Sequence, residues 1–170
     1  MSAVLQHEST AGTRQMLRLA CIQESLLVPI DAVREILEVG RLTPLPQTPG
    51  FVRGVMNLRG SVIPVIDLSA RFGHGPIELG RRSAIVVVEV PDDAGRPPLA
   101  MGLLVDAVYE VLDVDARAIE PVPALGMAVP PKFVAGMVNV RDRYSNLLNL
   151  AHTLSPEELM ALIGEEHPAP

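Results

Sequence analysis

The residue types that most often carry chemistry are sparse in this chain, and they are not grouped. The four histidines are His7, His74, His152 and His167, and none has a second histidine or a cysteine at the spacing of a metal site. The single cysteine, Cys21, lies in an apolar, strand-like run, which favours a small buried hydrophobe over a nucleophile. We therefore expect no metal, no cofactor and no internal disulfide.

The motifs of common active sites are also missing. The sequence contains no Gly-x-Ser-x-Gly elbow, no Walker loop and no Gly-x-Gly-x-x-Gly. The segment Gly73-His74-Gly75 is too short to hold a phosphate group. Acidic residues fall mainly at turns and caps, where structural roles are commoner than paired acid and base roles. The sequence therefore predicts no catalytic residues and a protein that is not an enzyme.

Two charged residues stand out on local grounds. Glu35 interrupts an apolar segment, and Arg59 precedes Gly60 at the tip of an expected hairpin. A solvated strand position and an ordinary turn residue explain both. The alternative is that charged residues at the junction of two lobes select a partner. The local sequence by itself favours the first explanation.

The elements that position these residues are repeated along the chain. The segment 31–39 (DAVREILEV) recurs at 106–114 (DAVYEVLDV) with 6 of 9 positions identical, and 49–59 (PGFVRGVMNLR) recurs at 131–141 (PKFVAGMVNVR). The two segments keep their order, at offsets of 75 and 82 residues. One structural unit is thus used twice, and the seam between such units is a common binding place.

Composition and charge exclude several classes of protein. The chain has 170 residues, 48% of them hydrophobic and 20% charged, which is ordinary for a folded domain. The net charge is −6, there is no Trp, and only 3% of residues are aromatic, so nucleic acid is not an expected partner. No apolar run approaches the roughly 18 residues of a spanning helix, so no direct membrane insertion is expected.

Short apolar strands separated by Pro and Gly predict a mainly β fold with about five strands in each half. We expect a flexible N-terminal tail at 1–13, a first half and barrel at 14–80, and a second half and barrel at 81–154. A C-terminal helix and tail should follow at 155–170. Its start is marked by a capping box from Ser155 to Glu158, and Leu159, Met160, Leu162 and Ile163 form its apolar face.

The segment 51–73 (FVRGVMNLRGSVIPVIDLSARFG) closely resembles the signature of CheW-like chemotaxis coupling proteins. The pattern G-V-x-N-L-R-G-x-V-I-P-V-I-D-L is long and specific, and the likeness extends from about Met16 to Ile163. The resemblance implies two SH3-like five-stranded β-barrel subdomains with short connecting helices.

The resemblance also implies a function. CheW-like proteins are non-catalytic scaffolds that couple the cytoplasmic tip of chemoreceptors, the methyl-accepting chemotaxis proteins, to the regulatory domain of a CheA-type histidine kinase. They are cytoplasmic and are recruited to membrane-associated receptor arrays through these partners. The receptor tip, a helical hairpin, lies in the groove between the two barrels, and barrel ends contact the kinase.

Binding residues follow from the same resemblance. The functionally sensitive Glu and Arg of the family map to Glu35 and Arg59, whose proximity the resemblance also implies. Asn57 and Gly60 belong to the same motif. The groove between the barrels is expected to be lined by Val33, Gly54, Gly102, Val108 and Val111. For the valines, packing in the core is an equally good explanation.

The second hairpin departs from the family pattern, because Ser145-Asn146 stands where apolar strand residues are usual. We expect these residues to weaken that barrel edge or to alter what docks on it. A CheW paralogue in a pilus-motility or other chemosensory pathway is the alternative function. A small-ligand sensor that uses the seam as a pocket is a third hypothesis, which the scarcity of aromatic residues disfavours.

Overall fold

The computed structural model describes residues 12–90, 95, 97–123, 126–155, 157, 158 and 161, and β-strands are its dominant elements. The first half contains β1 (Thr13–Cys21), β2 (Glu24–Pro29), η1 (Ile30–Ala32), β3 (Val33–Glu38), β4 (Val52–Leu58), β5 (Ser61–Asp67) and α2 (Leu68–Arg71). The second half contains β6 (Ala84–Val90), β7 (Leu99–Val105), β8 (Ala107–Asp115), η2 (Ala116–Ala118), η3 (Pro131–Phe133), β9 (Val134–Val140), β10 (Arg143–Leu148) and α3 (Leu150–Thr153). The predicted mainly β fold is confirmed.

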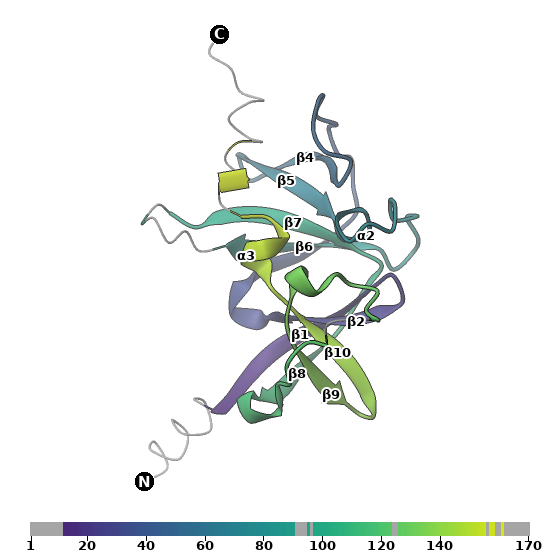
Figure 1. Ribbon diagram of the computed structural model, residues 1–170. Helices are drawn as coiled ribbons and strands as arrows, with labels where there is room; N and C mark the ends of the chain where they lie inside the picture. The colour runs from purple at the N-terminus through teal and green to yellow at the C-terminus, as the bar shows by residue number, and fades with distance from the viewer. Residues whose placement is uncertain are drawn as a thin grey trace.

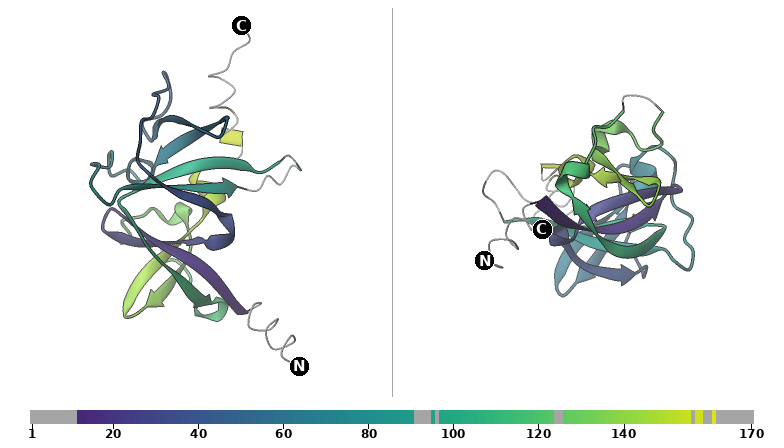
Figure 2. Two further views of the ribbon diagram at one scale, coloured as in Figure 1. Left: turned by 180° about the vertical axis from the view of Figure 1, so that it is seen from behind. Right: turned by 90° about the horizontal axis from the view of Figure 1, so that it is seen from below.

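The strands form two five-stranded sheets, which occupy opposite ends of the molecule (Figures 1 and 2). Sheet A has the order β8-β1-β2-β10-β9, and sheet B has the order β3-β6-β7-β5-β4. The order of the two sheets is the same once each strand is replaced by its counterpart in the other half. The sequence repeat is therefore a repeat of structure, with five strands in each half.

Neither sheet is built from a single half of the sequence, however, so the expectation of one barrel at 14–80 and another at 81–154 is wrong. Sheet A combines the first two strands of the first half with the last three of the second, and sheet B combines the remaining five. Within each sheet a parallel pair joins the two halves, β2 with β10 and β5 with β7. The two halves have exchanged their last three strands.

The short links inside each half explain this exchange. Only Asp106 separates β7 from β8, and a hairpin needs at least two residues to reverse the chain. The chain therefore runs on from one sheet into the other. The Asp106 backbone N–H donates to Ala20 O at 2.9 Å, and its carboxylate accepts from Ile22 N at 3.0 Å, which holds the crossing point against sheet A. The link from β2 to β3 is the single 3-10 turn η1.

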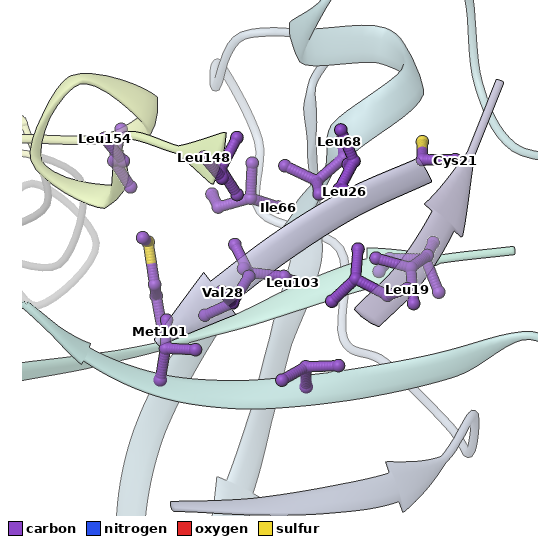
Figure 3. Packing of buried hydrophobic residues seen from close by; sticks show 14 of the residues in the cluster. Leu19, Cys21, Leu26, Val28, Ile66, Leu68, Met101, Leu103, Leu148 and Leu154 are labelled. Atoms are coloured by element: carbon purple, nitrogen blue, oxygen red, sulfur yellow. The ribbon is translucent and has the colours of Figure 1, made fainter. Parts of the chain in front are cut away.

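One apolar core is shared by both sheets. Figure 3 shows Leu19, Leu26 and Val28 of sheet A pointing toward Ile66 and Leu103 of sheet B, and all of them are buried. A smaller cluster belongs to sheet A alone; it contains Met16, Leu27, Val114, Val138 and Leu147. Strand β2 contributes to both clusters from its two faces, which is why its sequence is continuously apolar rather than alternating.

Cys21 lies in the shared core and is buried, as its surroundings in the sequence predicted (Figure 3). Burial raises the pKa of its thiol far above the usual range, and the negative charges of Asp106 and Asp67 raise it further. A thiol in this state is protonated at neutral pH and is not a nucleophile.

A backbone bridge crosses from the end of β3 to the far edge of sheet B. Thr43, five residues after β3, exchanges two backbone hydrogen bonds with Val55 of β4 at 2.9 and 2.8 Å. Gly54 permits this approach, because a Cβ atom there would lie 2.5 Å from Thr43 O. In the second half Glu120 pairs with Met137 of β9 in the same way, and Gly136 permits that close approach.

The polar pair Ser145-Asn146 does not lie at a barrel edge, since β10 is an inner strand between β2 and β9. Both residues are buried. The Ser145 hydroxyl is hydrogen-bonded to that of Ser25 at 2.7 Å, and Asn146 Nδ2 donates to Glu24 Oε1 at 3.5 Å. Asn146 Oδ1 has no partner among the described residues. The pair thus joins β10 to β2 through side chains, in addition to the parallel backbone pairing.

Only parts of the two chain ends are described. Residues 1–11 of the expected N-terminal tail lie outside the described residues. At the C-terminus the capping box is confirmed, because Glu158 N donates to Ser155 Oγ at 3.1 Å and Ser155 N donates to Glu158 Oε1 at 3.2 Å. Leu159, Met160, Leu162 and Ile163, the expected apolar face of this helix, lie outside the described residues.

The close approach at Gly54 gives a test of this architecture. Gly54→Ala should lower the free energy of unfolding by about 2 to 4 kcal/mol, because it combines a clash with the Thr43 backbone and a φ of 146° that is unfavourable for alanine. Gly50→Ala is the matched control, since nothing lies within 4 Å of a Cβ there. Urea unfolding followed by circular dichroism measures both. Equal stability of the two variants would contradict the bridge.

Candidate docking site

Glu35 lies on β3, an edge strand of sheet B, beside a β-bulge. Val33 pairs with Val88 and Glu35 with Val87, so that Arg34 is an extra residue on β3. A bulge bends the strand and changes the direction of the side chains next to it. Glu35 is the middle member of the half-buried positions of β3, with Val33 before it and Leu37 after it. The strand thus places a carboxylate in an otherwise apolar row.

Arg59 is presented by the tight turn between β4 and β5. Arg59 and Gly60 have φ values of 52° and 88°, as in the two-residue turns that suit hairpins. Asn57 supports the turn, because its Oδ1 accepts from Gly60 N at 2.9 Å. The contacts of Asn57 and Gly60, both expected site residues, are therefore contacts that shape the turn.

The structure brings Glu35 and Arg59 together from opposite edges of sheet B. Arg59 Nη1 donates to Glu35 Oε2, and Nη2 donates to Oε1 at 3.2 Å, which makes the pair bidentate. The Arg59 side chain is 74% exposed and that of Glu35 is 23% exposed. An ion pair with so much exposure contributes little to folding, because water screens its charges. Stability alone therefore gives little reason for the pair.

The ion pair forms one wall of a surface depression of about 370 Å³. A second ion pair, between Arg34 and Glu89, lies on the same surface. The lining residues are Arg34, Glu35, Leu58, Arg59, Ser61, Val62, Ile63, Val87, Glu89, Pro98, Leu99 and Ala100. The two ion pairs give the depression equal numbers of positive and negative side chains. The surface between the two pairs is apolar.

Several of these residues were not expected from the sequence. Val62 is exposed beside the buried Ile63, and Glu89 interrupts an apolar strand in the way that Glu35 does. That interruption was a usable signal for Glu89. Leu99 and Ala100 carry no such signal, because only the pairing of β6 with β7 places them at the depression.

The five expected groove residues are not gathered in one place. Gly54 and Gly102 are buried inside sheet B, where Gly54 faces the Thr43 backbone and Gly102 lies under the side chain of Ile85. They therefore do not line an open groove, which corrects that expectation. Their missing side chains serve close packing within sheet B.

Val33 and Val108 occupy equivalent positions in the two repeats. Each lies at or near the start of a strand that has just crossed between sheets, and each is half-buried against the shared core. Val111 is instead exposed on β8, the edge strand of sheet A. Its counterpart in the repeat is Ile36 of β3, which is equally exposed.

The described residues contain no group of three or more His, Cys, Asp or Glu side chains placed to hold a metal ion. No helix in that part of the chain is long and apolar enough to cross a membrane. What the site offers is an exposed, charge-balanced surface with apolar walls. Such a surface suits the side chains of another protein, and fold and site together define a β-rich adaptor.

Comparison with known proteins gives the family. A family model described as a CheW-like domain matches residues 15–159, so the chain belongs to the CheW-like family. The protein is a chemotaxis coupling adaptor, as its resemblance predicted.

Individual relatives agree with this assignment. The chain is 36% identical to the chemotaxis protein CheW of Rhizobium meliloti over 149 residues, 88% of this chain and 92% of that one. It is 33% identical to the protein FrzA of Myxococcus xanthus over 129 residues, 75% of this chain and 76% of that one. The crystal structure of the scaffolding protein TtCheW from Thermoanaerobacter tengcongensis matches with a TM-score of 0.75 and 32% identity, covering 85% of this chain and 90% of that one.

The ion pair has a titratable signature. The hydrogen bonds and positive charge of Arg59 hold the pKa of Glu35 below its ordinary value, and Glu35 correspondingly raises the pKa of Arg59. Arg59→Gln should therefore raise the pKa of Glu35 toward its ordinary value. Because that pKa is depressed in the folded state, the stabilising effect of the pair is present above the unfolded-state pKa and is lost as the pH falls through the folded-state pKa.

Carboxyl ¹³C chemical shifts followed from pH 7 to pH 2 measure this change. Arg117→Gln is the control, because Arg117 pairs with Asp115 and should shift the pKa of that carboxyl alone. An unchanged Glu35 titration in the Arg59 variant would show that the pair does not form in solution.

Proposed function

We propose that this adaptor joins the cytoplasmic tip of chemoreceptors to the regulatory domain of a CheA-type histidine kinase. It does so in the cytoplasm, where these partners recruit it to membrane-associated receptor arrays. The observation that carries the proposal is the Glu35–Arg59 ion pair, which a bulge and a tight turn hold in place and which, being largely exposed, contributes little to folding. Membership of the CheW-like family supports the same partners.

Two surfaces are assigned to the partners. The depression around Glu35 and Arg59 lies at one end of sheet B and serves as a specificity contact. A partner that places a charge opposite a side chain of the same sign in this depression is repelled. The receptor hairpin lies on the surface where the two sheets meet, near Val33 and Val108, which pack against the edge of the shared core. Their apolar side chains contribute affinity in the helix-in-groove mode.

Two further relatives are compatible with a second setting for the same activity. The relative FrzA is 33% identical to this chain, and the protein PilI of Pseudomonas aeruginosa is 33% identical over 113 residues, 65% of this chain. An adaptor of a pilus-motility or related chemosensory pathway would use the same architecture. The identity of the kinase that the protein captures distinguishes the two settings.

The decisive variant is Arg59→Glu. It should unfold at nearly the same urea concentration as the original protein, because the pair is largely exposed. It should also reduce co-sedimentation with receptor-containing membranes and kinase at least tenfold, since two carboxylates then face the partner. Arg117→Glu, another exposed arginine paired with a carboxylate, should assemble normally.

The double variant Glu35→Arg/Arg59→Glu separates two roles of the pair. It restores an ion pair of reversed direction. If the partner reads the individual charges, the double variant still fails to assemble, whereas recovery would show that the pair only shapes the surface. Normal ternary assembly by Arg59→Glu alone would refute the role assigned to Arg59.

A further inference from the structure

The structure contains a second copy of the Glu–Arg site. The repeat places Glu110 and Arg141 at the positions of Glu35 and Arg59, on the edge strand β8 and in the turn between β9 and β10. Asn139 Oδ1 accepts from Asp142 N at 3.0 Å, as in the first turn. This copy borders a depression of about 450 Å³ on sheet A, whose walls include Arg18, Ala20, Glu24, Tyr109, Val140, Arg141 and Arg143.

The carboxylate of this second copy is held by a different arginine. Arg18 donates to both oxygens of Glu110, at 2.9 and 3.1 Å, because a bulge places Tyr109 and Glu110 opposite it. These hydrogen bonds hold the pKa of Glu110 below its usual range. Arg141 is left at 3.6 Å from the same carboxylate and is 73% exposed. In the first site, by contrast, Arg59 itself occupies both oxygens of its glutamate.

Two further exchanges change the charges of the second depression, because one adds a guanidinium group and the other replaces one by a phenol. Arg143 stands where the first site has Ser61, and Tyr109 stands where it has Arg34. Among the described residues no carboxylate lies within ion-pair distance of Arg143. The Cζ atoms of Arg18 and Arg82 lie 4.3 and 4.9 Å from the centroid of the Tyr109 ring. Arg82 thus adds a fourth guanidinium group, beside those of Arg18, Arg141 and Arg143. These four guanidinium groups outnumber the carboxylates of Glu110 and Glu24, so the depression carries a local positive excess in a protein whose net charge is −6.

The rim of the depression includes a strained turn. Ile22 and Gln23 have φ values of 52° and 63°, and a β-branched residue rarely adopts such a value. The turn is held by the hydrogen bond from Ile22 N to Asp106. Strain of this kind persists where surrounding contacts fix it, and it clusters at functional sites. Here it presents the exposed Gln23 amide to the depression.

We propose that this depression binds an acidic segment of a partner protein. Arg141 and Arg143 receive Asp or Glu carboxylates, and Tyr109, Ala20 and Val140 pack against the apolar atoms of the segment. The open, partly apolar walls suit a peptide better than a small anion. This inference goes beyond the proposed function, because it assigns a second docking site with its own ligand chemistry.

A fluorescein-labelled (Glu-Ala)5 peptide tests the proposal against a (Gln-Ala)5 control, by fluorescence anisotropy and amide chemical-shift mapping. The acidic peptide alone should bind, with shifts at Gln23, Ser25, Tyr109 and Arg143. Arg143→Ser, which installs the residue of the first site, should weaken binding roughly tenfold, the effect of one charge-assisted hydrogen bond. Arg14→Ser, an exposed arginine outside the depression with the same change in net charge, should leave binding unchanged.

The reciprocal variant Ser61→Arg should create weak binding of the acidic peptide at the first site. Arg59→Glu should keep the binding described here, so failure of the proposed function would not be mistaken for failure of this inference. Equal weakening by Arg14→Ser and Arg143→Ser would overturn the proposal, because it would indicate general attraction between charges. Shifts confined to Glu35 and Arg59, or binding of inorganic phosphate without binding of the peptide, would also overturn it.

Discussion

The single residue between β7 and β8 constrains the rest of the structure. Because Asp106 cannot reverse the chain, β8 must leave sheet B and join sheet A, and the 3-10 turn after β2 has the same effect in the other direction. Each sheet is then completed by strands that the other half supplies, through one parallel pair per sheet. The shared core follows from this crossing, since Leu26 and Leu103 approach the same interior from different sheets. The two sheets are consequently parts of one cooperative unit, although each resembles a separate small domain.

The duplicated architecture has preserved the backbone and changed the chemistry. Both repeats keep the edge-strand glutamate beside a bulge, the asparagine-supported turn and the arginine at its tip. In sheet B the arginine is fully engaged with its glutamate, and the surface is balanced in charge. In sheet A Arg18 donates to both carboxylate oxygens of Glu110, so the turn residue Arg141 is held only loosely and lines the same depression as Arg143. An adaptor with two such surfaces can distinguish two partners without any difference in fold.

The sequence predicted the strands better than their partners. Alternation and turn residues were sufficient for ten strands in two sets of five, because these signals are local. The exchange of strands was not predicted, since the pairing of β2 with β10 spans about 120 residues and leaves no local pattern. The resemblance placed Glu35 and Arg59 together correctly, but it could not show that Gly54 and Gly102 are buried, because a glycine that packs and a glycine that lines a groove look alike in sequence. The second Glu–Arg pair was visible in the aligned repeats at Glu110 and Arg141. It became meaningful only when the geometry showed that Arg18 holds the glutamate.

The interleaving of the halves also sets an order of events during synthesis on the ribosome. β1 and β2 are made first, yet the strands that flank them in sheet A, β8 and β10, are among the last. Sheet B, in contrast, has all of its strands once Val105 has been translated. The nascent chain can therefore complete sheet B before sheet A. Until β10 has been translated, the apolar residues Leu26 to Val28 of β2 lack a pairing strand on one side. The β1–β2 hairpin is thus the part of the nascent chain most prone to aggregation, and it is the segment that a chaperone would most need to shield.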